Sequence, residues 1–146
     1  MKISGPEHFT LAFDTKKCAA TFSGIAKNNL PKLYVVVSNG ELIYVGVTKR
    51  PIRERFRSGW NAKGRGGYYG YAFRHTHTTA DLFVWCHEDA HNRSSLEMET
   101  VEAEVVFLVR SDGQWPRGQT EIHFHPSERQ HRELAATIMR CVRETV

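Results

Sequence analysis

Two short runs of β-branched and aromatic residues lie close together in the first third of the chain. Residues 33–37 (Leu-Tyr-Val-Val-Val) and 42–45 (Leu-Ile-Tyr-Val) are separated by a polar stretch that contains Asn39 and Gly40. An Asn-Gly pair favours the positive φ angles of a tight hairpin turn. The pattern therefore predicts a β-hairpin. Gly46, at the end of the second strand, is typical of a backbone that a ligand approaches closely.

A short amphipathic helix is predicted directly after this hairpin. Pro51 suits the first turn of a helix, and Ile52 and Phe56 are spaced one turn apart on one face. The rest of the helix surface carries three arginines: Arg53, Arg55 and Arg57.

A third strand and a longer helix are expected in the second half of the chain. Residues 81–87 predict a strand, and Ser94 or Ser95 can cap a helix over residues 96–110. The apolar residues of this helix repeat at three and four positions and are Met98, Val101, Val105 and Leu108.

The two ends of the chain predict further elements. Residues 9–13 favour a strand, residues 21–29 a short helix or loop, and residues 121–125 an added strand. Residues 126–130 have the pattern of a capping box, which starts an amphipathic helix that reaches about Arg143. Packing of this helix onto its own chain is favoured over pairing with a second subunit.

These elements predict a small α+β domain with a central, mostly antiparallel sheet of three or more strands flanked by helices. The 146 residues are expected to form a single domain with a core of ordinary size. Three widely spaced cysteines and the lack of an apolar signal segment predict free thiols and a cytoplasmic setting. No stretch approaches the roughly 20 apolar residues of a membrane span.

Positive charge is concentrated in one segment. Residues 49–74 hold eight lysines and arginines against one acid, whereas the whole chain has a net charge of only +4. A local basic patch is typical of a protein that binds a polyanion such as a nucleic acid. The candidate contacts are Lys49, Arg50, Arg53, Arg57, Lys63 and Arg65. The glycine-rich residues 61–71 hold three of the five tyrosines, which favour base stacking or, for any single tyrosine, core packing.

The hairpin and helix together resemble the GIY-YIG nuclease family. Its signature is two tripeptides on neighbouring strands, Gly-Ile-Tyr and Tyr-Ile-Gly, followed by a helix with an arginine. Here the tripeptides are Lys-Leu-Tyr, ending at Tyr34, and Tyr-Val-Gly, from Tyr44 to Gly46. Arg55 matches the arginine best, with Arg53 as its rival. The resemblance covers residues 32–120, which leaves an N-terminal extension, residues 1–31, and a C-terminal strand and helix, residues 121–146.

The resemblance also implies a metal-binding glutamate on the helix after the third strand. Of the glutamates there, Glu102 borders the apolar stripe and Glu104 projects away from it. A carboxylate at the edge of a core needs a partner, and a metal ion is one. Glu102 is therefore the first choice as metal ligand, with Glu104 second, and the expected cofactor is Mg²⁺ or Mn²⁺.

The implied chemistry is metal-dependent hydrolysis of DNA phosphodiester bonds. Glu102 would hold the cation, Arg55 would contact a phosphate oxygen, and Tyr34 would help to deprotonate the attacking water. A tyrosine acts as a base near neutrality only if its ordinary pKa of about 10 is lowered. Tyr44 would orient the water or the phosphate. Cleavage of duplex DNA often uses two active sites, so a homodimer is compatible with this chemistry, although nothing in the sequence supports one.

The first tripeptide keeps only its tyrosine, and the sequence departs from the family at two further places. The asparagine that many members carry after the glutamate is missing, and Gln114 and Gln119 are both open as replacements. The histidine that some members carry one turn after the arginine is replaced by Gly59 and Trp60.

Two other functions stay open. One is a noncatalytic nucleic-acid-binding module that needs only the basic patch. The other is a histidine-ligated metalloenzyme, because two histidine pairs sit at the i, i+2 spacing that places both on one face of a strand. The residues concerned are His75 with His77, and His123 with His125.

Overall fold

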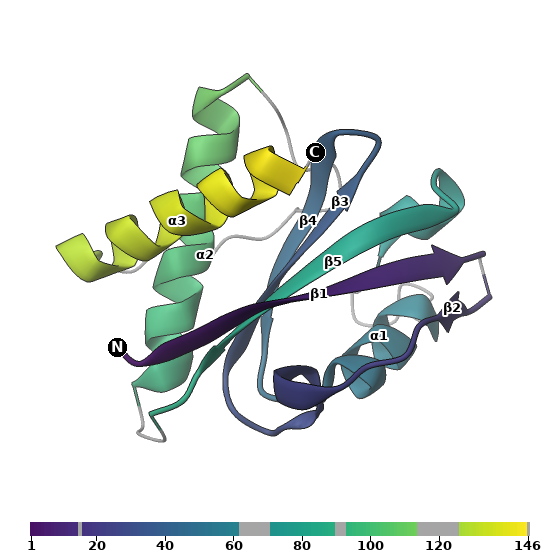
Figure 1. The fold of residues 1–146 in the computed structure, drawn as a ribbon, viewed down its shortest axis with the longest axis horizontal. Coiled ribbons are helices and arrows are strands. Elements are labelled where there is room, and N and C mark those ends of the chain that lie inside the picture. The colour runs from purple at the N-terminus through teal and green to yellow at the C-terminus, as the bar shows by residue number, and fades with distance from the viewer. Residues whose placement is uncertain (15, 62–70, 90–92, 114–125, 146) are drawn as a thin grey trace.

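A computed structural model of the chain describes residues 1–14, 16–61, 71–89, 93–113 and 126–145. Its centre is a five-stranded antiparallel sheet in the order β2-β1-β5-β3-β4 (Figure 1). The α+β class predicted from the sequence is confirmed. The strands are β1 (Ile3–Phe13), β2 (Cys18–Ala19), β3 (Lys32–Ser38), β4 (Glu41–Thr48) and β5 (Thr79–His87).

The predicted hairpin is formed by β3 and β4. Asn39 (φ 52°) and Gly40 (φ 77°) take the two positive φ angles that the Asn-Gly pair favours. Past the turn, Val36 pairs with Tyr44 and Val37 pairs with Leu42, so the residue between them, Ile43, is an extra one in β4. This bulge turns the side chains of Ile43 and Tyr44 toward the same apolar core.

Helices cover both faces of the sheet (Figure 1). Helices α2 (Ser94–Ser111) and α3 (Arg129–Thr145) pack on one face, where they share a core with Leu33, Val35 and Val45. Helix α1 (Ile52–Asn61) and the 3₁₀ turn η1 (Gly24–Lys27) lie on the other. Side chains alternate between faces along a strand, so Tyr34 and Val36 point toward α1. A second 3₁₀ turn, η3 (Ala72–His75), precedes β5.

The predicted helices exist, but their caps differ from the predictions. Neither Ser94 nor Ser95 caps α2, because Ser94 is its first residue and donates its hydroxyl to the carbonyl of Asp89. Helix α3 begins with half of a capping box, one residue later than the sequence pattern indicated, because only the His131 side chain takes part in it. The Glu128 N–H donates to Nδ1 of His131 at 3.0 Å, and the His131 N–H returns to the Glu128 carbonyl at 3.1 Å.

The N-terminal extension belongs to the main sheet. β1 is longer than the predicted strand over residues 9–13 and pairs with β5 along most of its length. The predicted turn of helix over residues 21–29 is η1. Helix α3 packs on α2 of its own chain, as expected. The strand predicted over residues 121–125 lies outside the described residues.

Cys18, Cys86 and Cys141 are free thiols, as predicted. Among the described residues, no helix combines the length and the apolar character that crossing a lipid bilayer requires.

A buried lysine ties η1 to the hairpin. Lys32, the first residue of β3, is fully buried. Its Nζ donates to the carbonyl oxygens of Asn28 and Leu30, both at 2.7 Å, and to that of Lys49 at 3.4 Å. These bonds join three chain segments at one ammonium group, which explains how a lysine is tolerated inside the fold.

This lysine predicts a pH-dependent stability. Burial lowers the pKa of Lys32 to about 8, from an ordinary value of 10.5. Between these pH values the unfolded chain binds more protons than the folded one, so raising the pH should increase the free energy of unfolding, by up to about 3 kcal/mol. Urea unfolding of wild type and Lys32→Met across this window provides the measurement. If both proteins show the same pH dependence, the assignment to Lys32 is wrong.

Candidate active site

Tyr34 and Gly46 face each other across the hairpin. They are a register pair of β3 and β4, and the Tyr34 ring lies directly on the glycine. A Cβ at position 46 would stand 2.5 Å from both Cζ and Oη of Tyr34. The glycine therefore makes room for a tyrosine ring, and not for a ligand as its place in the sequence had indicated. Tyr34 and the tripeptide that ends at Gly46 form one packed unit.

Other aromatic rings surround Tyr34. Tyr44 stacks beside it with 5.9 Å between ring centroids, and Phe56 of α1 meets it edge-on at 5.8 Å. The hydroxyl groups of Tyr34 and Tyr71 are 2.9 Å apart and share a hydrogen bond. Tyr71 is fully buried and lies 4.9 Å from Tyr44 between centroids. We call Tyr34, Tyr44, Tyr71 and Phe56 the tyrosine cluster.

Tyr71 fills the place that Gly59 leaves on α1. A Cβ at position 59 would overlap the Tyr71 ring, and the Tyr71 N–H donates to the Gly59 carbonyl at 3.3 Å. In the sequence, Gly59 stands only at the place of a missing family histidine, and Tyr71 is one of three tyrosines in a glycine-rich segment. One feature of the sequence could have indicated this contact: Gly59 lies on a helix face that otherwise carries large side chains, such as Phe56 and Trp60, and so leaves space for another ring. Tyr68 and Tyr69 lie outside the described residues.

Arg55 is the arginine that joins this cluster. Its guanidinium carbon lies 5.3 Å from the centroid of the Tyr71 ring, in a cation–π arrangement. The side chain is half-buried, whereas Arg53 and Arg57 are exposed. With about 100° per residue, Arg53 and Arg57 border the buried stripe of α1 on one side and Arg55 borders it on the other. The predicted preference for Arg55 over Arg53 therefore agrees with the geometry.

Burial controls the protonation of Tyr34. The pKa of its phenol is raised well above the ordinary value, first by complete burial and then by the neighbouring phenols of Tyr71 and Tyr44. Arg55 acts in the opposite direction, but its effect is smaller. A general base near neutrality would need a lowered pKa, so the prediction that Tyr34 acts as one is wrong for the free protein. Tyr34 remains protonated at neutral pH and acts as a hydrogen-bonding group.

Glu102 lies on a different part of the molecule. It is buried, with 6% of its surface exposed, on a helix that packs against the face opposite the tyrosine cluster. Helix α2 runs beside β4, which is an edge strand of the sheet. The sheet therefore separates Glu102 from the cluster. Glu104, the second choice, is half-buried.

The described residues form no complete metal site. Among the described residues, no group of three or more histidine, cysteine, aspartate or glutamate side chains could hold a metal ion. Mg²⁺, however, commonly binds through one or two carboxylates and completes its shell with waters and substrate phosphates. Glu102 offers one such hard oxygen ligand.

The described histidines do not form a metal centre. His75 is exposed, and Nδ1 of His77 lies 2.8 Å from the Thr76 hydroxyl. His87 is buried, and its Nε2 lies 2.5 Å from Glu97 while its Nδ1 accepts the Asp89 N–H at 3.2 Å. These contacts fix the ring and give His87 a structural role at the start of α2. The remaining predicted residues lie outside the described ranges: His123, His125, Gln114 and Gln119.

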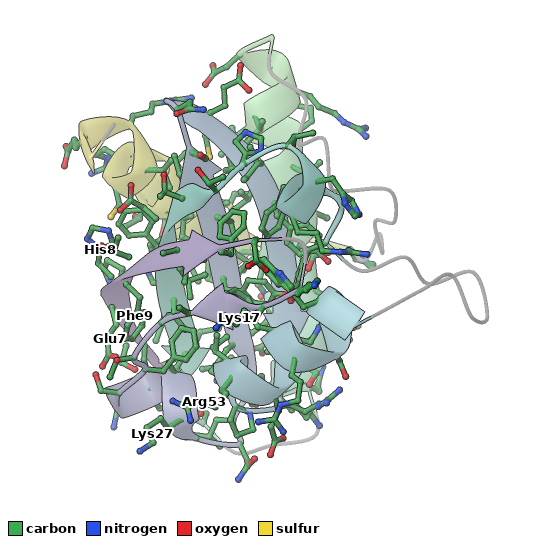
Figure 2. The ribbon with its side chains drawn as sticks, turned by 90° about the vertical axis from the view of Figure 1, so that its right-hand side faces the viewer. Glu7, His8, Phe9, Lys17, Lys27 and Arg53 are labelled. Atoms are coloured by element: carbon green, nitrogen blue, oxygen red, sulfur yellow. The ribbon has the colours of Figure 1, made fainter. Side chains whose placement is uncertain are left out.

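Four of the six predicted DNA contacts are described, and all four are exposed cations: Lys49, Arg50, Arg53 and Arg57. Arg50 donates to the Ser58 hydroxyl at 3.1 Å and lies along α1. Arg53 is on the side of the molecule that Figure 2 shows, together with Lys17 and Lys27 from the N-terminal extension. Lys63 and Arg65 lie outside the described residues.

Fold and site thus define an α+β protein with a tyrosine–arginine cluster on one face of its sheet and a buried carboxylate on the other. Comparison of the chain with protein-family models, curated proteins and solved structures gives no match. Its function is therefore inferred from its own residues.

Proposed function

We propose that the protein is a metal-dependent nuclease of the GIY-YIG type that hydrolyses DNA phosphodiester bonds. The observation that carries this proposal is the packing of Tyr34 on Gly46, because it joins the two tripeptides into one unit. Tyr44 and Arg55 adjoin the same unit. The order of hairpin, arginine helix, strand and glutamate helix is also the order that the resemblance implies.

In this proposal Arg55 binds the scissile phosphate. A guanidinium is planar and permanently charged, so it matches two phosphate oxygens and stabilises the charge that develops on them. The Tyr71 ring beneath it limits the orientations that the side chain can take. Tyr44 is only partly buried, which makes it the phenol that can orient the phosphate or the attacking water. Tyr34 stays protonated and holds Tyr71 in place through their hydrogen bond.

The carboxylate of Glu102 is the proposed ligand for the cation. A bound Mg²⁺ or Mn²⁺ would supply positive charge to the leaving oxygen. Tyr71 is assigned the position of the missing family histidine, since its ring fills the space beside Gly59 and its hydroxyl reaches the cluster. In this proposal the cleavage site lies at the edge strand β4, because Tyr44 is part of this strand and α2 packs beside it.

A noncatalytic nucleic-acid-binding module is the second candidate. The observation that favours it is that two of the proposed catalytic residues are buried on opposite faces of the sheet. Tyr34 is fully buried, and Glu102 is on the helix that covers the opposite face of the sheet. A binding module needs neither residue to reach the phosphate. Its affinity would come from the exposed cations of α1 and its neighbours.

Incubation with plasmid, single-stranded and branched DNA, with and without Mg²⁺, tests the first candidate. We expect Mg²⁺-dependent cleavage of at least one substrate. The Arg55→Lys variant should reduce kcat by about 10²- to 10³-fold with little change in KM, because lysine lacks the bidentate, ring-stacked geometry. Binding of all three DNA forms without any cleavage at high protein concentration would favour the binding module.

A further inference from the structure

A cavity of about 230 Å³ lies between the turn that joins β1 to β2 and the surface of α1. Four cationic side chains line it, two from each segment: Lys16 and Lys17 from the turn, and Arg53 and Arg57 from α1. Its apolar lining is formed by Phe22, Phe56 and Trp60, together with Cys18. The two lysines were not predicted as contacts, because they lie outside the basic segment of residues 49–74.

The turn that carries the lysines is fixed to α1. The carboxylate of Asp14 accepts the backbone N–H groups of Lys16 at 2.7 Å and Lys17 at 2.9 Å. The carbonyl of Asp14 accepts the indole N–H of Trp60 at 2.7 Å. The backbone bonds, and the charges of Lys17 and Lys16, lower the pKa of the Asp14 carboxyl, so the aspartate offsets part of the positive charge of the turn. The two lysines are thereby held opposite the two arginines.

The charge of this cavity is unbalanced. No acidic side chain is among the described residues that line it, and none of the four cations forms a salt bridge within the described part of the chain. The four cationic side chains are exposed to solvent, and together they give this cavity a positive potential that attracts an anion. Pockets for drug-sized ligands are about 300–1,000 Å³, so this smaller one suits a phosphate group better than a whole nucleotide.

The cavity adjoins the tyrosine cluster through Phe56, but its cationic side chains are on another side of α1 from Arg55. Arg55 borders the buried stripe of α1 on the side of Tyr71, whereas Arg53 and Arg57 border it on the side of the β1–β2 turn. Phe56 and Trp60 lie between the two sides and contact both. One helix therefore presents two cationic borders, and a nucleic-acid strand that crosses it can contact both of them through different phosphates.

We propose that this cavity binds a phosphate group of the nucleic-acid strand, away from the phosphate that Arg55 contacts. The identity of the partner rests on the proposed function, but the cavity does not require cleavage. The phosphate can be internal to the strand or at its end. An end phosphate carries the larger negative charge near neutral pH.

Fluorescence anisotropy of labelled single-stranded DNA, without divalent metal, tests the cavity apart from any cleavage. We expect Lys17→Ala and Arg53→Ala each to weaken binding several-fold. Each should also lower the slope of log affinity against log salt concentration by about 0.7, the value for one lost phosphate contact on a single strand. Arg140→Ala is the matched control, because it removes an exposed charge from α3 on the opposite face.

Strands with and without a terminal phosphate identify the source of the bound group. A loss of affinity on removing the terminal phosphate, seen in wild type but not in Arg53→Ala, assigns the cavity to a strand end. Equal affinities with the variant effects intact assign it to an internal phosphate. If both cavity variants bind like Arg140→Ala, the cavity proposal is wrong, even if the protein cleaves DNA. Absence of cleavage with the variant effects intact rejects only the nuclease.

Discussion

Replacing Glu102 by alanine should abolish metal-dependent cleavage and leave DNA binding largely intact. If Glu102 holds the cation, its loss removes several kcal/mol of charge stabilisation in the transition state, which corresponds to a rate loss of roughly 10³-fold or more. In the proposed function, binding depends on the exposed cations of α1 and the β1–β2 turn, which lie on the far side of the sheet. Single-turnover cleavage and anisotropy on the same DNA separate the two effects.

Two further variants make this result specific. Glu102→Gln keeps the volume of the buried side chain and removes only its charge, so it should lose cleavage while remaining folded by thermal unfolding. Glu104→Gln makes the same change two residues away on the same helix, at a half-buried position, and should cleave normally. Undiminished cleavage by Glu102→Gln would rule out Glu102 as the metal ligand.

Gly46→Ala should destabilise the protein by about 3 kcal/mol, at the upper end of what overpacking a core costs. The new Cβ would stand 2.5 Å from Cζ and Oη of Tyr34. The ring has nowhere to move, because it is fully buried between Tyr44 and Phe56 and is hydrogen-bonded to Tyr71. Urea unfolding of variant and wild type measures the change.

The clash between the new Cβ and the Tyr34 ring can be tested by making Gly46→Ala in proteins that also carry a substitution at Tyr34. Tyr34→Phe keeps Cζ against Gly46, so Gly46→Ala should remain costly in that background. Tyr34→Leu removes the ring, and the same glycine substitution should then have a much smaller effect. The two substitutions should therefore be coupled by about 1–3 kcal/mol in a double-mutant cycle. Additive effects would mean that the ring does not need the glycine.

Local patterns were sufficient to predict much of the fold. The Asn-Gly pair identified the hairpin turn because few other residues tolerate two positive φ angles in succession. The stripe of α2 identified its buried face, and that face includes Glu102. Both features depend on neighbours within one or two turns of chain. The preference for Arg55 over Arg53 came from family resemblance, and the geometry of α1 agrees with it.

The features that the sequence did not reveal depend on contacts between distant segments. Tyr71 meets Tyr34 across a long stretch of intervening chain, and no local period connects them. The raised pKa of Tyr34 follows from that meeting and from complete burial. Lys16 and Lys17 join Arg53 only because the turn that holds them packs on Trp60. The placement of Glu102 across the sheet from the tyrosines likewise follows from helix packing on two faces.

The pairing of β1 with β5 has a consequence for biosynthesis. β1 leaves the ribosome early, but its partner strand emerges only after the hairpin and α1 have been made. At about 5–20 residues per second, the nascent β1 waits several seconds with its backbone unpaired. The hairpin, whose strands are adjacent in sequence, can form during this wait. The β1–β2 turn therefore cannot take its final place in the sheet before β5 has been synthesised, so the cavity between this turn and α1 is completed later in synthesis than the hairpin.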